Sequence, residues 1–155
     1  MLHPTAAKVQ QRLRERGLDV DVRQLAASTR TVAEAAAAVG VETGQIVKSL
    51  VFTSGAHEHT LVLCAGDRRV DTSLLGDGWR TATASEVRAT TGFSIGGVPP
   101  LGHDRVLRTI VDASLRRFDS VWCAAGTPNA VFHVATDELF AAIPDGEIRA
   151  VGAET

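Results

Sequence analysis

Lys48 is the side chain whose place in the sequence most calls for a chemical explanation. It is one of two lysines in a chain of 155 residues, and it lies in the apolar run 46–52, which is typical of a buried strand. Because side chains alternate across a strand, this lysine shares a face with Ile46, Leu50 and Phe52. An unpaired ammonium is costly to bury. We therefore expect Lys48 to have a partner, to reach water from the strand end, or to contact a substrate.

The segment Gly92–Gly102 could bind a ligand through its backbone. It holds four glycines and two prolines. Glycine allows backbone N–H groups to come close to a ligand, and proline fixes the neighbouring chain. Converging N–H groups could hold a carbonyl oxygen, a developing oxyanion or a phosphate. The composition equally fits an irregular surface loop, and it lacks the spacing of a dinucleotide fingerprint or of a P-loop.

A second glycine turn, 124–129, interrupts the strand pattern between Cys123 and Ala130. It is either a plain hairpin connection or a second ligand-binding loop, and the residues alone leave both open.

The histidines and cysteines do not form a metal-binding pattern. His57 and His59 lie in one expected connection without a third ligand nearby in the sequence, so we assign no metal and no cofactor. His103 follows the glycine- and proline-rich segment directly and could reach a ligand, although a lone histidine is more often structural. Cys64 and Cys123 each lie in an apolar run and are expected to be buried free thiols.

Helices and strands alternate along the chain and must position these groups. Capping boxes and apolar spacing predict helices at residues 5–16, 31–39, 71–75, 83–91 and 137–142. Strand patterns occur at residues 19–25, 46–53, 60–65, 106–111, 120–124 and 130–135, and the second and third of these are expected to pair antiparallel. A turn is expected at 144–146. The pattern predicts one α+β domain over residues 1–155, with a curved mixed, largely antiparallel sheet or partial barrel and short surrounding helices.

Composition narrows the class of protein. Hydrophobic residues make up 45% and charged residues 22% of the chain, and no stretch approaches the roughly 20 apolar residues that span a bilayer. The first residues lack a signal-peptide pattern, so we expect a cytoplasmic protein without a membrane partner. A net charge of −2 argues against binding of DNA or long RNA by bulk electrostatics and leaves room for a small local phosphate contact.

Three segments in order, 46–50, 91–103 and 125–129, resemble the YbaK/ProX family. Members of this family are free-standing relatives of the editing domain inserted in bacterial prolyl-tRNA synthetase. The resemblance covers nearly the whole chain. It implies a curved mixed α/β fold and an aminoacyl-tRNA deacylase that hydrolyses the ester of wrongly charged tRNA, typically tRNA(Pro). The implied partners are the aminoacyl-tRNA acceptor end and, as a candidate, prolyl-tRNA synthetase.

The resemblance also implies roles for individual residues. Lys48 matches the essential pocket lysine of the family, Gly96–Pro100 match its GxxxP loop, and Gly126 matches the glycine of its later loop. Lys48 is expected to position the aminoacyl-ribose end, with a general base as the alternative, while loop amides including Gly97 hold the ester carbonyl. The further expected substrate contacts are Ser94, Ile95, Val98, Pro99, Pro100, Gly102, His103 and Thr127.

Two departures from the family bear on the substrate. The chain has no tyrosine, whereas some cysteine-editing relatives place one at the pocket, and its later loop reads Gly-Thr-Pro-Asn instead of Gly-Gly-Lys-Arg-Gly. Both differences weaken an assignment to cysteine. Alanine, serine, threonine or a short unbranched analogue stay open, because one methylene changes binding by only about 1–3 kcal/mol. The alternatives to a deacylase are a non-catalytic aminoacyl-tRNA or synthetase binding module and a small-molecule esterase.

Overall fold

The strands form two sheets and a short ribbon. The computed structural model describes residues 2–27, 29–55, 58–143 and 145–154. Within these ranges the five-stranded sheet has the order β5 (Trp79–Thr81), β2 (Val47–Ser54), β3 (His59–Ala65), β6 (Thr109–Asp112), β9 (Glu147–Arg149). The three-stranded sheet has the order β1 (Arg23–Gln24), β8 (Ala130–Ala135), β7 (Ser120–Ala124), and the ribbon pairs β10 (Gly152–Glu154) with β4 (Arg68–Val70). The five-stranded sheet is mixed, as expected, because β3–β6 and β6–β9 are parallel, whereas the three-stranded sheet and the ribbon are antiparallel.

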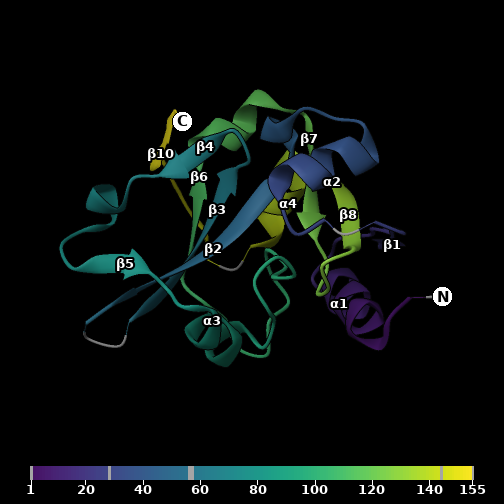
Figure 1. Cartoon of the computed structure of the whole chain (residues 1–155), viewed down its shortest axis with the longest axis horizontal. Coiled ribbons are helices and arrows are strands. Elements are labelled where there is room, and N and C mark those ends of the chain that lie inside the picture. Colours follow the sequence, from purple (N-terminus) through teal and green to yellow (C-terminus); the bar gives the residue numbers. More distant parts are fainter. Residues whose placement is uncertain (1, 28, 56–57, 144, 155) are drawn as a thin grey trace.

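Helices lie around the sheets, as Figure 1 shows. The four α-helices of the described residues are α1 (Pro4–Glu15), α2 (Val32–Val39), α3 (Ala84–Thr91) and α4 (Thr136–Ala142), and three 3₁₀ turns are η1 (Thr43–Gln45), η2 (Thr72–Leu75) and η3 (Ala113–Arg117). Both predicted capping boxes are present, at the starts of α2 and α3. None of these helices is long and apolar enough to cross a membrane.

Two predicted strands are shorter than expected. The strand expected at 19–25 is paired only at Arg23 and Gln24, because α1 side chains satisfy the backbone before it: Gln10 Oε1 accepts from Val22 N at 2.8 Å, and Arg14 Nε donates to Val20 O at 3.3 Å. The strand expected at 106–111 begins at residue 109. The prediction was wrong before that residue, where the chain runs over the surface and leaves the Val106 side chain 64% exposed.

The connections at the two predicted turns lie partly outside the described residues. Residues 56 and 57 of the β2–β3 connection and residue 144 of the expected 144–146 turn are not described. The antiparallel pairing of β2 with β3 is confirmed over seven residue pairs, from Val47 with Ala65 to Thr53 with His59.

One edge of β2 has strand partners only near its two ends. An isolated parallel bridge joins Ile46 to Trp122 of β7, and β5 pairs with β2 from Phe52 onward. Figure 1 shows β2 crossing the molecule between α2 and β5. Beyond the Ile46 bridge the two sheets diverge, which makes the structure a partial barrel that is not closed.

Side chains on the two faces of β2 enter different apolar clusters. Val47 and Val51 pack in the main core with residues of α1, β3, β7 and β8, whereas Phe52 packs with Val62, Cys64 and other residues on the opposite face. Strand alternation therefore places the neighbours Lys48 and Ser49 on opposite faces of β2.

Candidate functional site

A pocket opens where the two sheets diverge. It has a volume of about 180 Å³ and lies between α2, β2, β7 and the glycine- and proline-rich loop. Most of its wall is apolar. The apolar lining residues are Val32, Ala35, Val39, Ile46, Val47, Leu50, Ile95, Val98, Trp122, Cys123, Ala124 and Val131.

The polar part of the wall comes from two places in the chain. Thr29, Arg30 and Thr31 lead into α2, and Ser49 lies on β2. The Ser49 Oγ is buried and has no hydrogen-bond partner among the described residues. Within the same part of the chain, no aspartate or glutamate lines the pocket. The pocket is therefore a mainly apolar space with a few hydrogen-bonding groups, which suits a small organic group.

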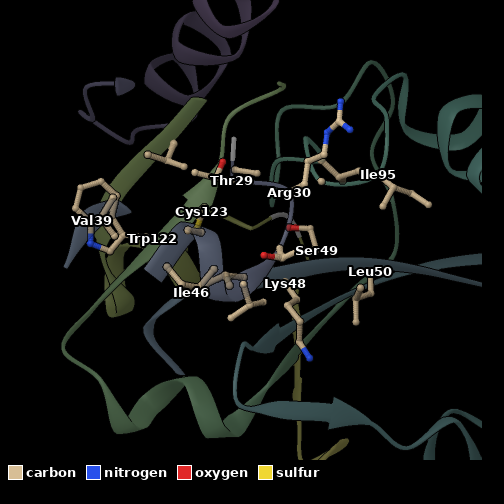
Figure 2. Close-up of a pocket in the computed structure, with 18 residues that line it drawn as sticks. Thr29, Arg30, Val39, Ile46, Lys48, Ser49, Leu50, Ile95, Trp122 and Cys123 are labelled. Atoms are coloured by element: carbon tan, nitrogen blue, oxygen red, sulfur yellow. The ribbon is translucent and has the colours of Figure 1, made fainter. Parts of the chain in front are cut away.

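Lys48 borders the pocket, but its amine lies elsewhere. Its Nζ donates a hydrogen bond to the backbone carbonyl of Arg68 in β4. In Figure 2 the Lys48 side chain runs away from Thr29 and Arg30. One of the expectations from the sequence, that this ammonium has a partner, is confirmed. The partner is a neutral carbonyl on the face of β2 opposite Ser49.

The first half of the glycine- and proline-rich loop forms one side of the pocket. Ile95, Gly96 and Val98 all line it. Among the described residues, no hydrogen bond engages the N–H groups of Gly96 and Val98. Gly97 differs, because its N–H donates to Ser94 O at 2.9 Å. The pocket-lining loop residues whose N–H groups remain unengaged, among those described, are thus Ile95, Gly96 and Val98.

Gly97 and Gly126 join the two glycine loops. Gly126 N donates to Gly97 O at 2.8 Å, and a Cβ added to Gly97 would lie 2.9 Å from Gly126 O. Gly126 itself has a φ of +100°, a conformation that L side chains rarely adopt. Neither residue lines the pocket, and neither does Ser94 or Thr127. These residues hold the pocket wall in place.

The later turn also carries the segment before α2. Leu25 N donates to Asn129 O at 2.7 Å, and Asn129 Nδ2 donates to Leu25 O at 3.2 Å. Thr29 N donates to Pro128 O. The turn therefore positions Thr29 and Arg30 at the pocket.

The second half of the loop turns toward α1. Pro99, Pro100, Gly102 and His103 do not line the pocket, and the last three line a separate small hollow. Buried His103 donates from Nε2 to Pro99 O at 2.8 Å. Burial lowers the pKa of His103, and the Pro99 hydrogen bond opposes that shift.

Both cysteines are free and buried, as expected. Burial raises the pKa of the Cys64 thiol to about 11 and also raises that of Cys123. Cys123 lines the pocket, but a thiol kept neutral by burial is a poor nucleophile. No group of three or more His, Cys, Asp and Glu side chains in the described part of the chain could hold a metal ion.

The structure brings together only part of the predicted site. Lys48, Ile95, Gly96 and Val98 lie at the pocket, whereas Ser49, Arg30 and Trp122 line it without having been singled out. The sequence did carry information on Ser49, because strand alternation places its side chain on the opposite face of the strand from Lys48. No local pattern in the sequence indicated Trp122 or Arg30.

Known proteins with similar sequences share this architecture. Residues 26–142 match the family model of the aminoacyl-tRNA editing domain. The uncharacterized protein YwhH of Bacillus subtilis (strain 168) is 34% identical over 123 residues, covering 77% of this chain and 78% of YwhH. A proline–tRNA ligase of Pelobacter propionicus is 30% identical over 92 residues, covering 56% of this chain, which spans 16% of that ligase.

A solved structure extends the likeness to the whole chain. The crystal structure of a candidate trans-editing enzyme for prolyl-tRNA synthetase is 44% identical, with a TM-score of 0.90 over 99% of each chain. The family model covers most of this chain, including β2, both glycine loops and the pocket between them. The chain thus belongs to the aminoacyl-tRNA editing domain family and is an aminoacyl-tRNA deacylase.

Proposed function

We propose that the protein acts in trans on mischarged tRNA(Pro) and removes a small wrong amino acid, with alanine, cysteine, serine and threonine as the candidates. The observation that carries this proposal is the mainly apolar pocket of about 180 Å³, bordered by the unengaged N–H groups of Gly96 and Val98. Such a space fits an amino-acid side chain next to donors for an ester carbonyl. The relation to proline–tRNA ligases and to a candidate trans-editing enzyme supports tRNA(Pro) as the carrier.

The reaction is ester hydrolysis. A water molecule attacks the carbonyl carbon, and negative charge develops on the carbonyl oxygen, where the Gly96 and Val98 N–H groups stabilise it. The bond to the terminal ribose oxygen then breaks, and that oxygen takes up a proton to replace the one that the attacking water has released. Free amino acid and uncharged tRNA are the products. No protein nucleophile is needed, in keeping with the neutral thiol of Cys123.

Lys48 has two roles open to it in this scheme. The one expected from its family position is to orient the aminoacyl-ribose end, for which its Nζ must leave the Arg68 carbonyl. The other is structural, because the same hydrogen bond ties β4 to β2 beside the pocket. The first role predicts loss of turnover with the fold unchanged, and the second predicts lower stability as well.

The test is a deacylation panel. Purified protein is mixed with tRNA(Pro) carrying alanine, cysteine, serine or threonine, and the remaining ester is measured over time. We expect turnover of at least one ester, and Lys48→Ala to remove most of it. Lys8→Ala is the matched control, because Lys8 is the other lysine and its exposed side chain lies on α1 near Asp104. No turnover across the panel would overturn the proposal.

Two further outcomes are informative. Binding of tRNA(Pro) without hydrolysis of any ester would favour the binding module that the missing tyrosine suggests. Turnover of simple amino-acid esters at the same rate, without tRNA, would favour a small-molecule esterase. A synthetase partner is tested by adding prolyl-tRNA synthetase, which raises the rate if the two proteins act together.

A further inference from the structure

The open edge of β2 directs the backbone of one residue into the pocket. In a strand, the N–H and C=O of one residue point to the same edge, and those of the next residue point to the other. Ala82 N donates to Val51 O at 3.0 Å on the β5 side of β2. The N–H and C=O of Ser49, two residues earlier, therefore face this same edge. No strand of the described chain pairs with β2 there, because the β7 bridge is at Ile46 and β5 begins at Phe52.

Ser49 therefore offers three polar groups at one place. Its main-chain N–H and C=O face the gap between the sheets. Ser49 lines the pocket, and its Oγ is buried there without a partner among the described residues. Buried polar groups are normally hydrogen-bonded, so an unpartnered set in a pocket indicates a ligand with matching groups. Ser54 gives a contrast on the same strand: its Oγ is also buried and unpartnered, yet it is not part of the pocket.

The substrate of a deacylase carries one group that needs acceptors. The α-ammonium of an aminoacyl ester has three donors, and in an apolar pocket each must find an oxygen. No carboxylate lines the described pocket, so the acceptors available on β2 are neutral oxygens. The Ser49 C=O and Oγ are such acceptors, and hydrogen bonds to a charged donor are the stronger kind.

We propose that Ser49 binds the α-ammonium group of the aminoacyl ester through its main-chain carbonyl and its Oγ, and so determines that the substrate has a free α-amine. This inference rests on the proposed function. It makes the enzyme select for an amino acid over the corresponding hydroxy acid, whatever the side chain. A site built to hydrogen-bond a substrate group discriminates strongly against the analogue that lacks it.

The experiment compares two esters that differ only at the α-position. The fastest ester of the panel is deaminated to its α-hydroxy analogue, for example lactyl-tRNA from alanyl-tRNA. Each kcat/KM is divided by the uncatalysed hydrolysis rate of the same ester, because the ammonium also activates the ester chemically. We expect the parent protein to prefer the amino ester by about 100-fold or more.

Ser49→Ala then isolates the contribution of Oγ. It should lower kcat/KM for the amino ester by about tenfold and that for the α-hydroxy ester by much less, because the ammonium loses a hydrogen bond from a charged donor and the hydroxyl loses at most a neutral one. Ser49→Thr keeps the hydroxyl, so this variant should retain the preference of the parent protein for the amino ester over the α-hydroxy ester. Ser54→Ala is the matched control and should leave both rates unchanged.

The inference is overturned if the parent hydrolyses both esters within about threefold of each other, or if Ser49→Ala slows both equally. The comparison of esters on the parent protein needs no variant, so it stands even if Ser49→Ala fails to fold. Failure of the proposed function looks different, because no aminoacyl ester would then be hydrolysed at all.

Discussion

The glycine- and proline-rich loop has two halves that contact different parts of the molecule. The pocket half, residues 95–98, lines the pocket with Ile95, Gly96 and Val98. The anchor half, which we define as residues 99–102 of the loop together with the following residues 103 and 104, is fixed instead to itself and to α1. There His103 donates to Pro99 O at 2.8 Å, and Arg12 donates to Gly102 O at 3.0 Å and to Asp104 Oδ1 at 2.6 Å.

The difference between the halves shows how a loop can present free amides in a fixed geometry. Amides that are to bind a ligand cannot be held by hydrogen bonds of their own, so their position depends on neighbouring residues. The hydrogen bond from Gly126 N to Gly97 O fixes the centre of the loop, and the contacts of the anchor half fix its end. Glycine occurs in both halves, so its presence does not separate binding from support, whereas both prolines lie in the anchor half.

Gly97→Ala should have the largest effect, because it breaks the junction of the two glycine loops. The added Cβ would lie 2.9 Å from Gly126 O, and a backbone atom cannot move aside without shifting the later turn. We expect deacylation to fall by about 100-fold and the free energy of unfolding by about 1–3 kcal/mol. Ester hydrolysis and urea unfolding measure the two effects.

Gly55→Ala serves as the control for Gly97→Ala. A Cβ at Gly55 meets nothing within 4 Å, so activity and stability should both stay at the parent values. Unchanged deacylation by Gly97→Ala would mean that the two glycine loops need no fixed junction.

The fold could be predicted largely because its signals are local. Capping boxes and the apolar runs of β2, β3, β7 and β8 depend on neighbouring residues, and all of them were predicted. The strands β4, β5, β9 and β10 were missed. Each has three residues, too few for a periodic pattern, and each is stabilised by a partner distant in sequence.

The site was harder to predict because it depends on where two sheets part. The glycine motifs identified the loop, yet nothing in the loop shows that Gly97 N–H bonds to Ser94 while its neighbours stay unengaged. Trp122 reaches the pocket only through the bridge between β7 and Ile46. Contacts of this kind join residues far apart in the chain, where spacing carries no information.

Arg12→Ala tests the anchor half. It removes hydrogen bonds to Gly102 O and Asp104, and the Arg12 side chain is only 25% exposed. We expect the free energy of unfolding to fall by about 1 kcal/mol, since the partner carboxylate is largely in water. Turnover at saturating substrate should stay within about twofold. A loss of turnover as large as that of Gly97→Ala would remove the distinction between the halves.

Ile95→Ala tests the pocket half. In contrast to Arg12→Ala, it should weaken substrate binding and leave stability unchanged. The Ile95 side chain is 57% exposed at the pocket, so its removal costs little stability. It offers apolar surface to a bound substrate, and we expect KM to rise about fivefold with kcat and the thermal midpoint unchanged. Steady-state kinetics with the best ester of the panel measure this, and a lower thermal midpoint with unchanged KM would contradict it.

The pH dependence of the free energy of unfolding should reveal the contribution of His103 in the anchor half. We expect this to be the smallest of the predicted effects. Burial lowers the pKa of His103 below its ordinary value of 6.5, so the folded protein holds this ring neutral. Its contribution is complete above about pH 6.5 and is lost as the pH falls through the lower folded value, because the unfolded chain binds the proton first. Arg12 lowers the pKa of Asp104, so that carboxylate stays ionised in this range. Urea unfolding at pH 7.5 and 5.5 should show a smaller loss for His103→Gln than for the parent, and equal losses would show that His103 does not stabilise the anchor half through its neutral form.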